Sequence, residues 1–203
     1  MIKSSSFIAV LLSIGSLSMA EAKDGLPIDL RCEHLVNPLG IDNAKPRFSW
    51  KLQDERAGAM QTAYQLIVDT DSMSVVNNRG QIWDTGKEAN DAILLPFAGA
   101  KLKPQTRYFW KVTSWDKDGN AQASSVAAFE TGMMGKAQWK GSWISDNHDV
   151  NYKPAPYFRK EFNLKKPIAS ARAYIAVAGL YELSLNGAKV GDHRLDPMYT
   201  RFD

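Results

Sequence analysis

The chain has one cysteine among its 203 residues, so no disulfide can form within it. Blocks of like charge are also missing: 25 Lys and Arg stand against 22 Asp and Glu, for a net charge of +3. This balance argues against nucleic acid or an anionic membrane surface as a partner. Sustained helical periodicity is absent too between residue 24 and the linker at 133–138, and residues 71–78 are expected to hold one helical turn at most.

The motifs of common catalytic sites are missing as well. No Gly-rich phosphate loop precedes a helix, and no Gly-x-Ser-x-Gly motif occurs. The three histidines, His34, His148 and His193, are too scattered for a metal motif. We therefore expect neither a metal nor a cofactor in this chain.

Paired carboxylates are the first residues to consider for acid–base hydrolysis. The candidate pairs are Asp69 with Asp71, Asp116 with Asp118, and Glu182 with Asp192. The first pair lies at the end of an expected strand and the second in an expected turn, where acids usually bind water or backbone N–H groups. We assign no catalytic role to any of these pairs.

The turn from Asp116 to Asn120 faintly resembles a calcium-binding loop. An EF-hand loop requires glycine at its sixth position and glutamate at its twelfth. Here Gly119 is fourth and Ala127 is twelfth, counted from Asp116. We interpret the segment as a hairpin turn, because Asp, Gly and Asn accept positive φ.

The longest apolar stretch is near the N-terminus, at residues 7–17, and follows Lys3. Small residues at 18–20 occupy the positions that a signal peptidase reads, and 20–22 is an alternative cleavage site. The stretch is too short to span a bilayer comfortably. We interpret residues 1–20 as a cleaved signal peptide and not as a retained anchor. The mature protein is therefore expected to be periplasmic or secreted, without membrane contact after cleavage.

The segment at 102–112 has the strongest strand pattern in the chain. Six residues fall on every second position and can share one face of a strand: Leu102, Pro104, Thr106, Tyr108, Trp110 and Val112. Pro104 has no N–H and suits the entrance of a strand better than its middle. Tyr108 is expected to bury its ring and to turn its hydroxyl back to a nearby backbone group.

Shorter alternating segments occur about every ten residues, separated by turn formers. They lie at 28–32, 48–52, 64–68, 82–86, 93–95 and 124–131. This spacing predicts an all-β sandwich. The order Leu-x-Pro-x-Thr-x-Tyr-x-x-x-Val at 102–112 resembles a recurring signature of fibronectin type III domains, members of the immunoglobulin-like class. The resemblance places such a domain at residues 24–132, with Cys32 buried on its first strand.

A second β unit is expected after a linker at 133–138. Residues 169–177 alternate as a strand, and 179–185 form another. Asn186-Gly187 is the strongest short hairpin signal in the chain, and residues 189–191 carry the return strand. This unit, at 139–203, is interpreted as an incomplete second β-sandwich.

Residues 139–203 resemble the opening of the N-terminal β-sandwich domain of bacterial α-L-rhamnosidases, glycoside hydrolase family 78. The segments that carry the resemblance are 143–144, 155–162, 173–179, 181–183, 185–187, 190–192 and 195–197. A fibronectin-like domain commonly precedes this one in the family. One departure follows Asp196-Pro197, where the family usually has Gly and then Trp but this chain has Met198-Tyr199.

The resemblance implies a chain that is the non-catalytic N-terminal part of a secreted α-L-rhamnosidase. Such enzymes hydrolyse terminal α-L-rhamnosyl residues by inversion, with two carboxylates on a C-terminal (α/α)6 barrel. That barrel is missing from these 203 residues, so no position here inherits a catalytic role. The partners implied are the missing catalytic domain and, through the full-length enzyme, a rhamnose-containing carbohydrate. The alternative is an exported fibronectin-like module that binds carbohydrate or protein without enzymatic activity; an intact small hydrolase is the weakest reading.

Two groups of residues are candidates for carbohydrate contact. Tyr181, Glu182 and Asn186 belong to the unit that resembles a carbohydrate-associated module. The competing interpretation, which we favour, is that the strand from 181 to 186 alternates between core and solvent. Among the six tryptophans, Trp50 and Trp110 are expected in the core. Trp83 and Trp115 are ambiguous, whereas Trp139 and Trp143 flank the linker.

Overall fold

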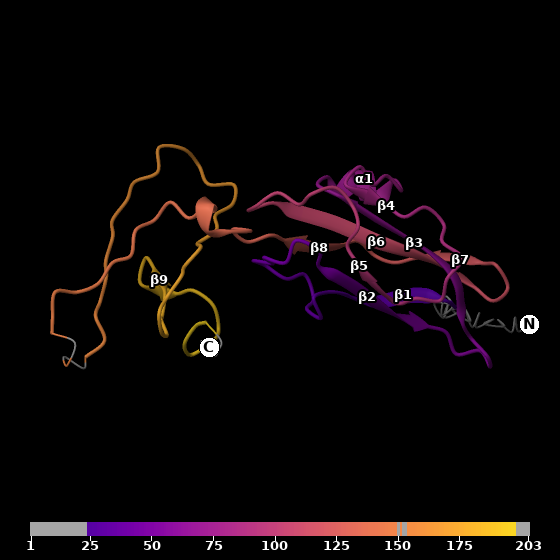
Figure 1. The fold of residues 1–203 in the computed structure, drawn as a ribbon, viewed down its shortest axis with the longest axis horizontal. Coiled ribbons are helices and arrows are strands. Elements are labelled where there is room, and N and C mark those ends of the chain that lie inside the picture. Colours follow the sequence, from indigo (N-terminus) through magenta and orange to yellow (C-terminus); the bar gives the residue numbers. More distant parts are fainter. Residues whose placement is uncertain (1–23, 150, 152–153, 198–203) are drawn as a thin grey trace, which may run out of the picture. The chain divides into compact units, whose positions relative to one another are not determined.

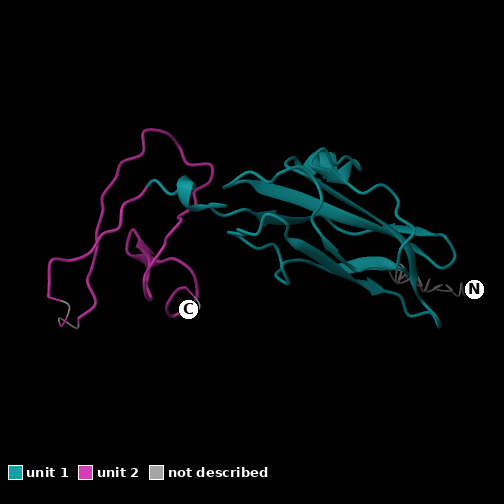
Figure 2. Ribbon diagram, viewed as in Figure 1, with its two compact units in different colours: residues 1–140 teal, residues 141–203 magenta. Residues whose placement is uncertain are grey.

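The computed structural model describes residues 24–149, 151 and 154–197. The signal peptide expected at 1–20 and the departure at Met198-Tyr199 lie outside these residues. The chain forms two compact units, residues 1–140 and 141–203 (Figure 2). Each unit is described by itself.

The first unit is a sandwich of two antiparallel sheets (Figure 1). One sheet contains, in this order, β1 (Leu26–Cys32), β2 (Arg47–Gln53) and β5 (Leu94–Pro96). The other contains β4 (Trp83–Asp84), β3 (Gln61–Asp69) and β6 (Arg107–Asp116), and β6 also pairs with β7 (Ala121–Ala123) and β8 (Ala127–Glu130). This arrangement confirms the prediction of an all-β, immunoglobulin-like fold.

Aromatic side chains from both sheets fill the space between them. Phe48 of β2 is fully buried and packs edge-on against Trp110 of β6, with ring centroids 4.7 Å apart, and against Phe129 of β8, at 5.5 Å. Trp50 is 2% exposed, and its Nε1–H donates to Gln61 Oε1 at 3.0 Å. Both tryptophans predicted for the core are therefore there. The period-two patterns of β2, β3 and β6 place this set of rings on facing surfaces.

One short helix covers the outer face of the larger sheet. Helix α1 (Ser72–Val76) lies on the side of β3 and β6 that faces away from the core (Figure 1). Lys111 of β6 is 7% exposed, and its Nζ donates to the carbonyl oxygen of Val76 at 3.0 Å. Burial lowers the pKa of Lys111. The single helical turn expected at 71–78 is confirmed.

The first strand departs from the expected alternation. Ile28 is 37% exposed, whereas Leu30 and Cys32 are buried. The pairing of β1 with β2 shifts register between Ile28 and Arg31, and Asp29 has φ of 49°. This bulge adds one residue to β1 and so reverses the faces on its two sides. The prediction that residues 28, 30 and 32 alternate onto one face is wrong at Ile28 for this reason.

The last expected strand is interrupted. Of residues 124–131, only 127–130 form a strand, β8, and residues 121–123 before them form β7; both strands pair with β6. Between them, Ser124 Oγ accepts a hydrogen bond from Val112 N at 3.1 Å and donates to Ser125 O at 2.8 Å. The Ser124 hydroxyl thus accepts the hydrogen bond of the Val112 N–H in β6, and the ladder is interrupted at this point.

The corner before β6 has the predicted tyrosine arrangement. Tyr108 is 1% exposed, and its hydroxyl accepts a hydrogen bond from Lys103 N at 2.7 Å. Its ring stacks on Phe129, with centroids 5.1 Å apart and an interplanar angle of 16°. The bond ties the loop that enters β6 to the strand itself.

The second unit contains much less regular structure. A 3-10 helix, η1 (Lys136–Gln138), precedes it, and its described residues contain the strands β9 (Ser184–Leu185) and β10 (Ala188–Lys189). Asn186, with φ of 51°, and Gly187, with φ of 82°, form the predicted turn between them. The strand expected at 169–177 is wrong: no ladder forms over these residues. A strand needs a hydrogen-bonded neighbouring strand, and no strand of the described structure pairs with residues 169–177. Burial does not hold the segment in place either, because no described residue of this unit is buried.

We expect Tyr108→Phe to lower the free energy of unfolding of the first unit by about 1–2 kcal/mol, because Lys103 N loses its acceptor while the ring stack on Phe129 remains. Urea unfolding followed by tryptophan fluorescence measures this change. Tyr64→Phe is the matched control, since the described structure gives the Tyr64 hydroxyl no hydrogen bond. Equal stability of the two variants would contradict the corner's role.

Limited proteolysis of the 203-residue chain should leave the first unit intact and remove the second. The resistant fragment is expected to end near Gly132–Met134, where Gly132 N donates to Ile41 O at 2.9 Å and Met134 N to Asp42 Oδ1 at 2.7 Å. Mass spectrometry of the fragments identifies the end point. A resistant fragment that still contains β9 and β10 would show that the second unit folds stably by itself.

Candidate functional site

A cluster of charged side chains surrounds Arg56 at one end of the first unit. This residue belongs to the loop between β2 and β3. Its guanidinium contacts four carboxylates, Asp54 at 2.6 Å, Asp116 at 2.8 Å, Asp118 at 2.8 Å and Asp24 at 3.4 Å. The side chains of Asp54 and Asp116 are only 4% and 2% exposed. One guanidinium therefore forms ion pairs with acids from three separate segments of the chain.

Asp116 also organises the turn after β6. Its Oδ1 accepts hydrogen bonds from Asp118 N at 2.9 Å and Asn120 N at 2.8 Å, and its Oδ2 accepts from Asn120 Nδ2 at 3.1 Å. These donors, with Arg56, occupy the oxygens that a calcium ion would need. No group of acids, histidines or cysteines in the described residues has the geometry of a metal site. The segment is a hairpin turn, as its glycine spacing indicates.

The cluster strongly favours ionised side chains. Burial of Asp116 raises its pKa, but hydrogen bonds from Arg56, from the Asn120 side chain and from two backbone N–H groups outweigh burial and hold the pKa well below its usual range. The Arg56 hydrogen bonds likewise lower the pKa of Asp54. A general acid needs a raised pKa at neutral pH, so these carboxylates are unsuited to that role.

The other two carboxylate pairs also have local structural roles. Asp69 Oδ1 accepts from Asp71 N at 3.1 Å, and its Oδ2 accepts from Gln81 N at 2.9 Å. Asp71 caps α1 through the N–H groups of Met73 and Ser74. Glu182 accepts from Lys189 Nζ at 3.0 Å, and no ion pair or hydrogen bond in the described residues joins it to Asp192.

The three residues proposed for sugar contact lie in and beside the hairpin of the second unit. Tyr181 is half-buried and exchanges backbone hydrogen bonds with Asp196, at 2.6 and 2.9 Å. Glu182 is paired with Lys189, and Asn186 forms the turn. No interaction between the side chains of the three is found in the described structure.

Two histidines lie beside carboxylates in the second unit. His193 Nδ1 lies 2.9 Å from Asp196 Oδ1, and this hydrogen bond raises the pKa of the imidazole. His148 Nδ1 lies 3.3 Å from Asp146 Oδ2. Both pairs are exposed, and His34 lies in the loop after β1 of the first unit.

Of the remaining four tryptophans, two make ring contacts and two are exposed to solvent. Trp83 packs edge-on against Phe97, with centroids 5.2 Å apart. Trp115 lies on the outer face of β6, and Lys87 Nζ lies 4.4 Å from the centroid of its ring. Trp139 and Trp143 are 40% and 77% exposed. Lys87 thus lies over one face of the Trp115 ring.

Cys32 is a core residue without accessible thiol chemistry. It is 1% exposed, and burial raises its pKa to about 12. The prediction of a buried cysteine on the first strand is confirmed. None of the described helices has the length and apolar character that crossing a bilayer requires.

Sequence reasoning missed Arg56 as the centre of a cluster. Its loop was recognisable as charged, but Asp54 is two positions away whereas Asp116 and Asp118 are about sixty positions away. Local sequence gives no signal for contacts at that separation. The pairing of β3 with β6 brings the two loops together at the same end of the sheet.

Comparison with known proteins supplies the family. Residues 27–135 match the model for the Rha78A-like N-terminal immunoglobulin domain, and residues 166–203 match the α-L-rhamnosidase N-terminal domain. An α-L-rhamnosidase of Streptomyces avermitilis is 35% identical over 182 residues, which cover 78% of this chain and 18% of that protein. One from Formosa agariphila is 32% identical over 208 residues, covering 97% and 22%. The chain spans about a fifth of the length of the curated relatives it matches.

Solved structures give the same result. The α-L-rhamnosidase of Dictyoglumus thermophilum aligns with a TM-score of 0.59 and 40% identity over 62% of this chain and 15% of that one. The Streptomyces avermitilis α-L-rhamnosidase complexed with L-rhamnose aligns with a TM-score of 0.56 and 41% identity over 59% and 12%. The first unit is therefore a domain of the immunoglobulin-like sandwich class. The chain belongs to the Rha78A-like family and corresponds to the N-terminal region of α-L-rhamnosidases.

We predict that Asp116→Asn removes a source of acid sensitivity. The folded protein lowers the pKa of Asp116, so this carboxylate stabilises the fold above about pH 4 and loses its contribution as pH falls through the lower, folded-state pKa. At pH 7 the variant should lose on the order of 5–10 °C in Tm, because Arg56 and Asn120 keep unmatched donors. Between pH 4 and 2 its Tm should fall less steeply than that of the parent.

The exposed Asp91→Asn variant is the control for this titration, and thermal unfolding followed by circular dichroism at several pH values is the measurement. Parallel pH curves for Asp116→Asn and Asp91→Asn, with equal Tm at pH 7, would refute the role of the Arg56 cluster.

Proposed function

We propose that this chain is the non-catalytic N-terminal part of a secreted α-L-rhamnosidase, which hydrolyses terminal α-L-rhamnosyl residues of glycans or glycosides. The observation that carries the proposal is the pair of family matches in sequence order, at 27–135 and 166–203. Both belong to α-L-rhamnosidases, and the matched relatives are about five times longer. A relative complexed with L-rhamnose supports a rhamnose-containing carbohydrate as the substrate of the whole enzyme.

In this proposal, catalysis belongs to a domain outside these 203 residues. An inverting glycosidase needs one carboxylic acid with a raised pKa and a second carboxylate roughly 6.5–9.5 Å away, on the opposite face of the sugar. In the first unit, Asp54 and Asp116 are instead held ionised on Arg56. This supports an accessory role for the chain, in which its β units space and brace the catalytic domain that follows.

Secretion is part of the proposal and is supported by the N-terminal sequence, with Lys3, the apolar run at 7–17 and small residues at 18–20. A weak carbohydrate contact at Tyr181, Glu182 and Asn186 is also retained. Its support is the solvent exposure of Glu182 and Asn186. The ion pair of Glu182 with Lys189 competes with such a contact, so a sugar must displace the lysine to reach that carboxylate.

The proposal predicts that the reading frame continues past the codon for Asp203 into a helical catalytic domain. The purified full-length product should release nitrophenol from an aryl α-L-rhamnoside, and the 203-residue chain should release none. A stop codon directly after Asp203 would favour the alternative, an exported fibronectin-like binding module. Rhamnosidase activity in the 203-residue chain would overturn the assignment of a non-catalytic role.

A further inference from the structure

The turn between β9 and β10 is the one Asn-Gly pair in the chain, Asn186-Gly187. Glycine has no side chain, so its backbone nitrogen can approach the side-chain carbonyl carbon of the preceding residue without steric hindrance. Attack by that nitrogen closes a five-membered ring and expels the side-chain nitrogen as ammonia. The pair therefore carries both reacting atoms of a self-modification, and its surroundings decide whether the reaction proceeds.

Neither reacting group is held by the rest of the molecule. Asn186 and Gly187 are both exposed to solvent. In the described residues no hydrogen bond engages the Asn186 side-chain amide or the Gly187 N–H, although the residues on either side of the turn pair as strands. Water and base can therefore reach the nitrogen and the carbonyl carbon, and no bond has to be broken at either group before they react.

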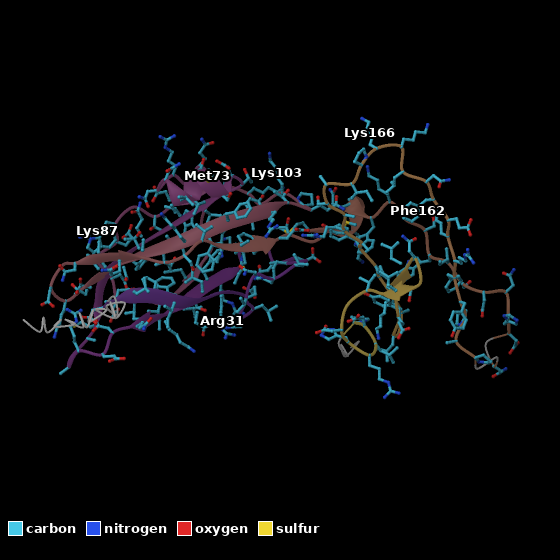
Figure 3. The ribbon with its side chains drawn as sticks, turned by 180° about the vertical axis from the view of Figure 1, so that it is seen from behind. Arg31, Met73, Lys87, Lys103, Phe162 and Lys166 are labelled. Carbon is cyan, nitrogen blue, oxygen red and sulfur yellow. The ribbon has the colours of Figure 1, made fainter. Side chains whose placement is uncertain are left out.

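Little holds the turn closed. β9 and β10 contain two residues each, and one further backbone hydrogen bond beside them runs from Val190 N to Leu183 O at 2.9 Å. No described residue of this unit is buried, and Phe162, whose position Figure 3 shows, is 62% exposed. A short hairpin without a core opens at little cost in free energy, which lets the Gly187 nitrogen reach the Asn186 carbonyl carbon.

Two Asp-Gly pairs in the first unit have the same atoms in reach, and there the fold opposes ring closure. In Asp24-Gly25 the glycine N–H donates to Gln53 O at 2.9 Å, and in Asp118-Gly119 it donates to Asp116 O at 3.1 Å. Arg56 binds the aspartate carboxylate of each pair, at 3.4 and 2.8 Å. A carboxylate bound to a guanidinium is a poor target for a nitrogen that is itself hydrogen-bonded, so the reactive pair is the one in the second unit.

We propose that Asn186 is a self-modification site, at which the chain converts this asparagine into aspartate and isoaspartate. Gly187 N loses its proton to a base and bonds to Asn186 Cγ, the Cγ–Nδ2 bond breaks, and the side-chain nitrogen takes up a proton and leaves as ammonia. Water then opens the ring at either carbonyl carbon and restores the Gly187 N–H. The reaction consumes water alone and involves no oxidation or reduction, so it is independent of any rhamnosidase activity.

The isoaspartyl product disrupts the hairpin. Its main chain runs through the former side chain, so an extra carbon atom enters a turn in which two residues with positive φ connect the strands. The ion pair between Glu182 and Lys189, at 3.0 Å, crosses the same hairpin and is weakened when the strands separate. Asn186 and Glu182 are also candidates for sugar contact, so the modification removes this candidate site with the hairpin.

The test incubates the purified 203-residue chain in mildly alkaline buffer and follows each asparagine by mass spectrometry of its peptides. Deamidation at Asn186 should be at least about tenfold faster than at Asn90, whose Oδ1 accepts from Ala92 N at 2.8 Å. Gly187→Ala should slow it by a similar factor, because the added Cβ hinders the nitrogen. Isoaspartate should accumulate beside aspartate, as measured by enzymatic methylation of isoaspartyl residues.

Equal rates at Asn186 and Asn90 would overturn the proposal, as would a Gly187→Ala chain that deamidates as fast as the parent. Aspartate without isoaspartate would also count against it, because direct hydrolysis of the amide gives aspartate alone. Asp24-Gly25 and Asp118-Gly119 should isomerise in urea but not in the folded chain. Isomerisation of either pair in the folded chain at the rate of Asn186 would refute the protection that the first unit is expected to give.

Discussion

The first unit depends on one packing constraint, the burial of the inner face of β6 among aromatic rings of both sheets. Trp110 and Tyr108 of this strand meet Phe48 and Phe129, and all four side chains are at most 1% exposed. Burying one large side chain of this kind contributes roughly 1.5–3 kcal/mol, so the group outweighs any single surface interaction. Trp110 Nε1 has no hydrogen-bond partner in the described residues, which is a cost that this ring packing offsets.

Polar interactions then close the two ends of this sandwich in different ways. At one end Arg56 joins acids from the N-terminal lead-in, the β2–β3 loop and the β6–β7 turn. At the other, the loop after β1 binds β8 and the start of the linker through Pro38, Ile41 and Asp42. In the first arrangement the carboxylates are bound to Arg56, so their role is structural and not catalytic. The second fixes the point from which the rest of the polypeptide departs.

The two units differ in how their apolar residues are used. The first buries its rings within its own sheets, whereas the described part of the second leaves Tyr157, Phe158 and Phe162 more than half exposed. Among the described residues of this unit, the one ladder is the four-residue pairing of β9 with β10. A two-stranded hairpin is marginally stable in water by itself.

Local patterns in the sequence determined several elements in both units. Alternation in β2, β3 and β6, the Pro104–Tyr108 corner and the Asn186-Gly187 turn were all predictable, because each depends on side chains and φ preferences within a few residues. The bulge at Asp29, the break at Ser124 and the unpaired segment at 169–177 were not, since each depends on what lies across the sheet. The ion pairs of Arg56 and the exposure of the loop after β1 were not predictable either, for the same reason. Only the tertiary structure brought acids sixty positions apart onto one guanidinium, because no local signal encodes a contact that two paired strands create at a distance.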